Sequence, residues 1–94
     1  MSAAYEPDDV IAIAPHFRLQ WEEAQQGHVL LYPEGMVRLN ETAAEILLLC
    51  AQSTSFGSLL RTMRDRYPEA ELEPDLREFL GEAAAHGWIR IERP

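Results

Sequence analysis

Residues 28–47, with the sequence HVLLYPEGMVRLNETAAEIL, contain the change from strands to helices that decides the fold. Residues 28–32 are apolar on both faces over most of their length, which is typical of a strand in the middle of a sheet. Pro33 and Gly35 predict a tight turn, because proline fixes φ and glycine accepts a positive φ. We therefore expect residues 36–39 to form a short strand that pairs with residues 28–32.

The second half of this stretch predicts a helix. Asn40 can accept a backbone hydrogen bond as the N-cap, but Thr42 and Glu45 also have the spacing of a capping box, so two starting positions are open. From there to about residue 51 the sequence is apolar nearly all round. A helix with this pattern is expected to lie buried at the centre of the fold.

Toward the N-terminus, residues 16–22 alternate between apolar and polar side chains, with Phe17, Leu19 and Trp21 on one face. This alternation predicts a half-buried strand, which a turn at residues 25–27 connects to the next strand. The sequence thus predicts a three-stranded antiparallel meander. Residues 1–14 show no useful periodicity, and we expect an irregular N-terminal arm that is disordered alone or packed on a neighbour.

Two more helices are predicted toward the C-terminus. In residues 56–67 apolar side chains recur at helical spacing. Pro74 is well placed as the first residue of a third helix, and Gly87 is suited to end it. Residues 88–91 predict a short final strand. The expected fold class is α+β and winged-helix-like, with residues 15–94 as one domain.

The charge of the chain argues against two classes of partner. Eight arginines and no lysine stand against sixteen acidic residues, which gives a net charge of −8. The predicted third helix is acidic as well. Nucleic acids and anionic membrane surfaces are negatively charged, so we expect neither as a partner. A winged-helix DNA-binding regulator is the alternative from another functional class, and this charge disfavours it.

No pattern of residues indicates catalysis. His16, His28 and His86 are isolated and lack the spacing of metal ligands, so we expect structural roles for them. Cys50 falls in the most apolar helix, where a thiol keeps a high pKa and stays unreactive. Phosphate-binding and nucleophile motifs are missing too. We expect no enzyme activity, no cofactor and no metal.

The expected location is the cytosol. The single cysteine cannot form an internal disulfide, and the N-terminal sequence lacks the basic and apolar regions of a signal peptide. The longest unbroken apolar run, residues 46–51, is far shorter than the 20 or so residues of a membrane span.

Residues 29–47, VLLYPEGMVRLNETAAEIL, resemble the signature of the PqqD family. The pattern PxFRLxW at residues 15–21 is similar to the family as well. So is the end of the chain, where FL at residue 79 is followed by HGWI at residue 86. The resemblance therefore covers residues 15–91. Residues 50–57 depart from the family pattern, so the resemblance leaves the shape of that connection open.

The resemblance implies a non-catalytic peptide chaperone of pyrroloquinoline quinone biosynthesis. Such a protein binds the ribosomal precursor peptide PqqA and presents it to the radical SAM enzyme PqqE. The peptide adds as an extra strand beside the third strand, in a groove bounded by the third helix. About five backbone hydrogen bonds at about 1 kcal/mol each fall short of the roughly −8 kcal/mol of a micromolar complex, so two or three buried peptide side chains are also expected.

The expected groove combines one segment of the third strand with one segment of the third helix. Its residues are Met36, Val37, Arg38, Leu39, Leu76, Arg77, Phe79 and Leu80. The two arginines would meet acidic residues of the peptide. The alternative is that most of the apolar members only fill the core and that the arginines are solvated surface charges.

Two further interactions are expected. Arg61 and Arg64 in the second helix suggest a surface for the partner enzyme, and the alternative is an ordinary polar helix face.

A third hypothesis for the function is a structural subunit that docks on the modifying enzyme without binding the free peptide. The edge strand and the N-terminal arm would also allow a homodimer formed by exchange of either element.

Overall fold

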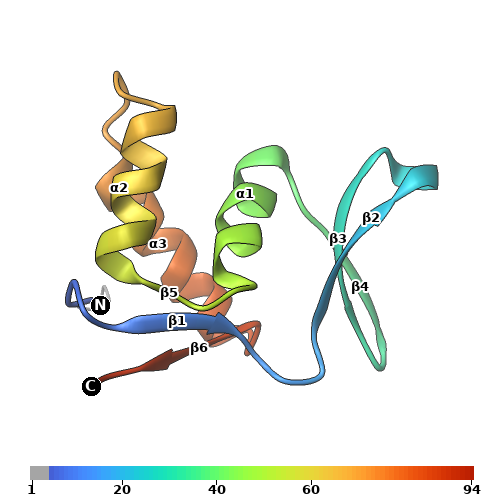
Figure 1. Ribbon diagram of the computed structural model, residues 1–94. Helices are drawn as coiled ribbons and strands as arrows, with labels where there is room; N and C mark the ends of the chain where they lie inside the picture. The colour runs from blue at the N-terminus through green and yellow to red at the C-terminus, as the bar shows by residue number, and fades with distance from the viewer. Residues whose placement is uncertain (1–4) are drawn as a thin grey trace.

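The computed structural model describes residues 5–94 and consists of three helices and two small sheets (Figure 1). The elements in chain order are β1 (Val10–Ile13), β2 (Arg18–Glu22), the short 3-10 helix η1 (Glu23–Gln25), β3 (Gly27–Tyr32), β4 (Gly35–Arg38), α1 (Glu41–Cys50), β5 (Thr54–Ser55), α2 (Phe56–Arg66), α3 (Leu72–Ala85) and β6 (Ile89–Glu92). One sheet has the strand order β2-β3-β4, and the other has the order β5-β1-β6. In Figure 1, α1 stands between the α2–α3 pair and the β2-β3-β4 sheet.

The predicted meander, the three helices and the C-terminal strand are confirmed. In the meander, β3 pairs antiparallel with both neighbours, and Leu30 lies opposite Leu19 on β2 and Val37 on β4. Asn40 is the N-cap of α1, because its Oδ1 accepts a hydrogen bond of 2.8 Å from the backbone N–H of Ala43.

Helix α3 begins at Leu72, earlier than the start predicted at Pro74. Proline is tolerated within the first turn of a helix, where an N–H group would have no helical partner in any case. The break between the first two helices is also more ordered than expected, since Thr54 and Ser55 form β5 and the Ser55 side chain caps α2.

The expectation of an irregular arm over residues 1–14 is wrong for its second half. Residues 10–13 form β1, the central strand of its sheet, which pairs with β5 on one side and β6 on the other. Ile11 is fully buried, and the Tyr5 ring stacks on Phe56 at a centroid distance of 5.5 Å. The strand is short and pairs with the opposite end of the chain, so no local pattern marks it. The first four residues of the predicted arm lie outside the described residues.

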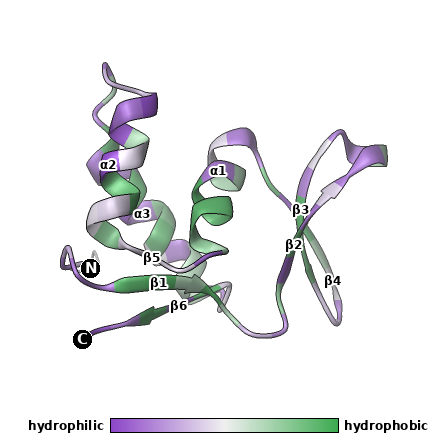
Figure 2. Cartoon of the chain, in the orientation of Figure 1, coloured by the Kyte–Doolittle hydropathy of each residue, from purple (hydrophilic) through white to green (hydrophobic). Residues whose placement is uncertain are grey.

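The core lies between the three helices and the sheet that contains β1. Leu47 of α1, Leu59 and Met63 of α2, and Leu80 of α3 are all at most 1% exposed. Figure 2 shows hydrophobic residues along β1 and the inner turns of α1, whereas the outer end of α2 is hydrophilic. This core fixes the positions of α1 and α3, the two helices that border the candidate site.

Candidate functional site

The outer edge of β4 has no strand neighbour among residues 5–94. The N–H of Leu39 donates to the carbonyl of His28, the residue opposite it, at 3.1 Å. In an antiparallel ladder such bonded pairs alternate with non-bonded pairs. Val37 and Gly35 therefore bond to β3, whereas the N–H and C=O groups of Met36 and Arg38 point outward. The open edge offers four backbone groups, one fewer than the five hydrogen bonds expected from the sequence.

A groove of about 320 Å³ begins where β4 ends. It lies between the β4–α1 connection, the first turns of α1 and one face of α3, and its apolar side chains are buried or half-buried. These apolar residues are Leu39, Ala43, Ile46, Met63, Leu72, Leu76, Phe79 and Trp88. The other lining residues are polar and exposed: Arg38, Asn40, Thr42, Asp75 and Glu82. The groove thus has an apolar floor and charged rims, with the basic group on the β4 side and the acidic groups on α3.

Four of the residues predicted from the sequence line this groove together. They are Arg38, Leu39, Leu76 and Phe79. The structure does not bring the other four to it. Met36 is 45% exposed on β4, and the backbone of Val37 bonds to β3. On α3, Leu80 is fully buried in the core and Arg77 borders a different cavity.

Helix geometry explains which residues of α3 face the groove. Successive residues of an α-helix are rotated by about 100°, so Asp75, Leu76 and Glu82 project within about 60° of Phe79. On the same basis Arg77 projects about 160° from Phe79 and Leu80 about 100°. Sequence reasoning missed Asp75 and Glu82, although this angular count was available from the sequence. It also missed Trp88, which follows the helix and has no periodic signal.

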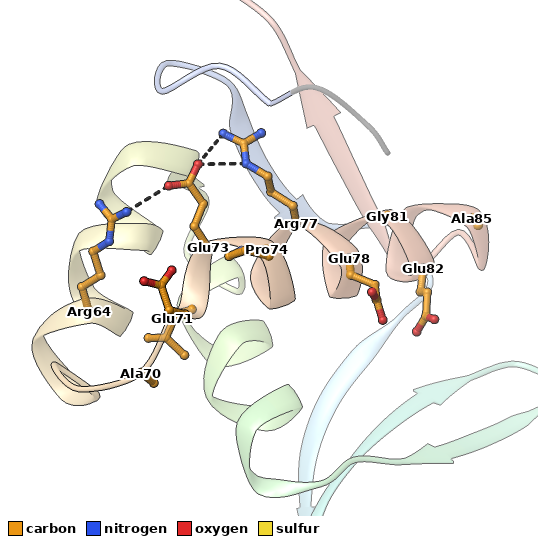
Figure 3. Close-up of a pocket in the computed structure, with 11 residues that line it drawn as sticks. Arg64, Ala70, Glu71, Glu73, Pro74, Arg77, Glu78, Gly81, Glu82 and Ala85 are labelled. Atoms are coloured by element: carbon orange, nitrogen blue, oxygen red, sulfur yellow. Dashed lines mark hydrogen bonds and ion pairs between the residues drawn. The ribbon is translucent and has the colours of Figure 1, made fainter. Parts of the chain in front are cut away.

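Arg77 lies on the opposite side of α3 and is held there by several contacts (Figure 3). Its Nη2 and Nε donate to Oε2 of Glu73 at 2.8 and 3.0 Å, and its Nη1 donates to the carbonyl of Tyr5 at 3.3 Å. The guanidinium also lies 4.7 Å from the centroid of the Phe56 ring. These contacts give Arg77 a structural role in joining the N-terminal segment to the helices.

The side of α3 that carries Arg77 borders a second, more open cavity of about 980 Å³. There the second oxygen of Glu73 accepts a hydrogen bond of 2.9 Å from Arg64, so one carboxylate holds two arginines. Figure 3 shows Glu78 and Glu82 pointing away from both arginines. Arg61, the other residue predicted to contact an enzyme, is exposed on α2.

Cys50, the one cysteine of the sequence, is buried. Burial raises the pKa of the Cys50 thiol to about 12, so the thiol stays protonated and unreactive at neutral pH. Among residues 5–94 there is no cluster of three or more histidine, cysteine or carboxylate side chains that could hold a metal ion. No helix in the described part of the chain has the length and apolar character needed to span a bilayer.

Comparison with known proteins supplies a family. The family model described as coenzyme PQQ synthesis protein D (PqqD) matches residues 27–89. A protein of Methylococcus capsulatus named PqqA binding protein is 48% identical over 85 residues, which cover 90% of this chain and 91% of the relative. A protein of the same name from Klebsiella pneumoniae (strain 342) is 43% identical over 86 residues, which cover 90% of this chain and 94% of the relative.

A solved structure has the same fold. The PqqD truncation of Methylobacterium extorquens PqqCD, determined by solution NMR, is similar with a TM-score of 0.72 and 25% identity, over 96% of each chain. That protein is described as a functional, stand-alone recognition element for ribosomally synthesized and post-translationally modified peptides.

Proposed function

Because this chain belongs to the PqqD family, we propose that it binds a PqqA-type precursor peptide and presents it to the radical SAM enzyme PqqE without itself catalysing a reaction. The observation that carries this proposal is the open edge of β4, which lies directly beside an apolar groove. The names of the relatives support the choice of peptide. The proposed place of action is the cytosol, where a ribosomally made peptide first becomes available.

In the proposed complex the peptide pairs with β4 and places apolar side chains in the groove. Four hydrogen bonds to Met36 and Arg38 would contribute about 4 kcal/mol, whereas a micromolar complex needs about −8 kcal/mol. Each apolar side chain that is buried against Leu76 and Phe79 would add about 1.5–3 kcal/mol. Two or three such side chains close the difference. The Arg38 side chain is free among the described residues to meet an acidic residue of the peptide.

Calorimetric titration with a synthetic PqqA-type peptide tests this function. We expect micromolar or tighter binding, and a loss of at least tenfold in affinity for Phe79→Asp, because the charge would desolvate next to the bound peptide. Leu48→Asp is the matched control, since Leu48 is 45% exposed on α1 and does not line the groove. Circular dichroism would confirm that both variants are folded, and Phe79→Ala is the milder substitution if the aspartate variant is not.

The titration also separates the competing functions. No binding of the peptide at high micromolar concentration would contradict peptide recognition and favour a structural subunit that only docks on the enzyme. A DNA-binding regulator would instead shift a duplex in electrophoresis at low salt. The acidic rim of α3, formed by Asp75 and Glu82, would repel the phosphates of such a duplex.

We further propose that a second copy of the chain can pair at the same edge of β4 to form a weak homodimer. An open strand edge is a template for such pairing. Exchange of the N-terminal arm is the less favourable route, because β1 is the central strand of its own sheet. If β4 is the contact, saturating peptide should shift the sedimentation coefficient from dimer to monomer.

A further inference from the structure

Two carboxylates border the groove on α3 and have no partner in the described part of the chain. Asp75 and Glu82 flank Phe79 on the same helix face, and both are exposed. Neither side chain makes a hydrogen bond or an ion pair with any other residue between 5 and 94. By contrast, Glu73 holds Arg64 and Arg77, and Glu45 holds Arg66. The acidic residues that support the fold are thus paired, whereas those at the groove are available to a ligand.

The spacing of these residues suits an extended peptide. At a rise of 1.5 Å per residue, Asp75 and Glu82 lie about 6 Å and 4.5 Å from Phe79 along the axis of α3. In an extended strand, side chains on the same face recur about every 6.6 Å. A peptide side chain placed over Phe79 therefore has its neighbours of the same face within reach of one or both carboxylates.

The two rims of the groove differ in charge, so they favour peptide side chains of opposite charge. Arg38 on the β4 side favours an acidic group, and the two carboxylates on the α3 side favour a basic group. The apolar floor next to the carboxylates lowers the local dielectric and strengthens any ion pair formed there. A peptide without a basic residue near its apolar anchor would leave both carboxylates partly desolvated and unpaired.

We propose that Asp75 and Glu82 select a peptide segment that carries a lysine or arginine within two positions of the apolar residue bound over Phe79. This inference rests on the proposed peptide-binding function and adds a charge requirement to it. It assigns a role in specificity to two residues of the groove that the sequence pattern did not single out.

The test compares two double variants with the same change in net charge. Asp75→Asn/Glu82→Gln removes the two carboxylates of the groove, whereas Glu71→Gln/Glu78→Gln removes two exposed carboxylates that line only the outer cavity. Each is titrated at low salt with a synthetic PqqA-type peptide and with the same peptide in which every lysine and arginine is replaced by glutamine. We expect the first variant to bind the unmodified peptide about three- to tenfold more weakly than the second.

The modified peptide provides the decisive control. With its basic residues removed, the first variant should bind at least as tightly as the second, because no ion pair remains to be lost and the second variant still desolvates both carboxylates of the groove. Equal affinities for the unmodified peptide would overturn the inference and leave the proposed function intact. If the unaltered protein binds neither peptide, the proposed function fails and the inference fails with it.

Discussion

At the scale of single residues, Arg77 connects three segments that are distant in the sequence. It bonds to Glu73 of α3, to the carbonyl of Tyr5 and to the face of the Phe56 ring, and its side chain is 29% exposed. Arg77→Gln should lower the free energy of unfolding by about 1–2 kcal/mol, because it removes charge-assisted hydrogen bonds and a cation–π contact. Urea denaturation would measure this change.

The same variant distinguishes a structural role from a role in recognition. Arg77 does not line the groove, so Arg77→Gln should bind the precursor peptide with unchanged affinity. A folded Arg77→Gln protein with much weaker peptide binding would instead support the direct contact that the sequence suggested.

Glu45 and Tyr67 form a pH-sensitive link between α1 and the end of α2. The Tyr67 hydroxyl donates a hydrogen bond of 2.5 Å to Glu45, and Arg66 pairs with the same carboxylate at 3.1 Å. The bond from Tyr67, with a smaller contribution from Arg66, holds the pKa of Glu45 below its ordinary 4.5. Acceptance of that bond by Glu45 raises the pKa of Tyr67 above its ordinary 10.0.

These shifts set the sign of the pH dependence. The lowered pKa of Glu45 stabilises the fold above pH 4.5, and that stability is lost as the pH falls through the folded-state pKa. The raised pKa of Tyr67 stabilises the fold below pH 10.0, and that stability is lost as the pH rises. Tyr67→Phe should therefore be less stable than the parent at pH 7, and the gap should narrow below pH 4. Tyr32→Phe is the control for the loss of a tyrosine hydroxyl. If Tyr67→Phe differs from the parent by the same free energy of unfolding at both pH values, the link between Tyr67 and Glu45 is contradicted.

At the scale of elements, one edge of β4 pairs with β3 and the other has no strand neighbour among residues 5–94. Val37 bonds to β3, whereas the N–H of Met36 points to the open edge. Proline is tolerated in an edge strand where its missing N–H would have faced solvent. Met36→Pro should therefore fold, but it should bind the peptide roughly fivefold more weakly through the loss of one hydrogen bond of about 1 kcal/mol. Met36→Ala keeps the N–H and separates this effect from loss of the side chain.

Proline at the neighbouring position should affect the stability of the fold. Val37→Pro removes a hydrogen bond within the meander and should reduce stability itself. If Met36→Pro binds the peptide as tightly as Met36→Ala, the peptide does not use this backbone group and strand addition at β4 is wrong.

The elements that could be predicted from the sequence are those with a local signal. The alternation before Trp21, the turn at Pro33 and the cap at Asn40 predicted the meander and α1 correctly. Strand β1 could not be found in this way, because its partners β5 and β6 come much later in the chain. The resemblance pointed to β4 and α3, and the structure has a groove that residues of both segments line. The rotation per residue explains why Phe79 faces this groove and Arg77 does not.

At the scale of the whole molecule, an adaptor must bind a peptide and an enzyme at the same time. The groove opens between β4, α1 and α3, whereas Arg61 and Arg64 are exposed on α2 and do not line it. In a chain with a net charge of −8, exposed arginines are the feature of α2 most suited to an acidic patch on a partner. Arg61 has no partner among the described residues, whereas Arg64 would meet such a patch while paired with Glu73 or in exchange for it. Occupation of the groove would leave this surface free.

If the enzyme binds to α2 and the peptide binds to the groove, a substitution on α2 should weaken binding of the enzyme alone. Arg61→Glu/Arg64→Glu should weaken binding to PqqE at least tenfold through like-charge repulsion, with peptide affinity unchanged within about twofold. Arg18→Glu/Arg90→Glu is the matched control, because it makes the same change in net charge at exposed positions of β2 and β6. Surface plasmon resonance with immobilised enzyme would compare the two variants with and without peptide. If both lose enzyme binding equally, the enzyme responds to total charge and α2 is not the docking surface. If only the α2 variant loses it while still binding peptide, the chain has one surface for each partner, as an adaptor requires.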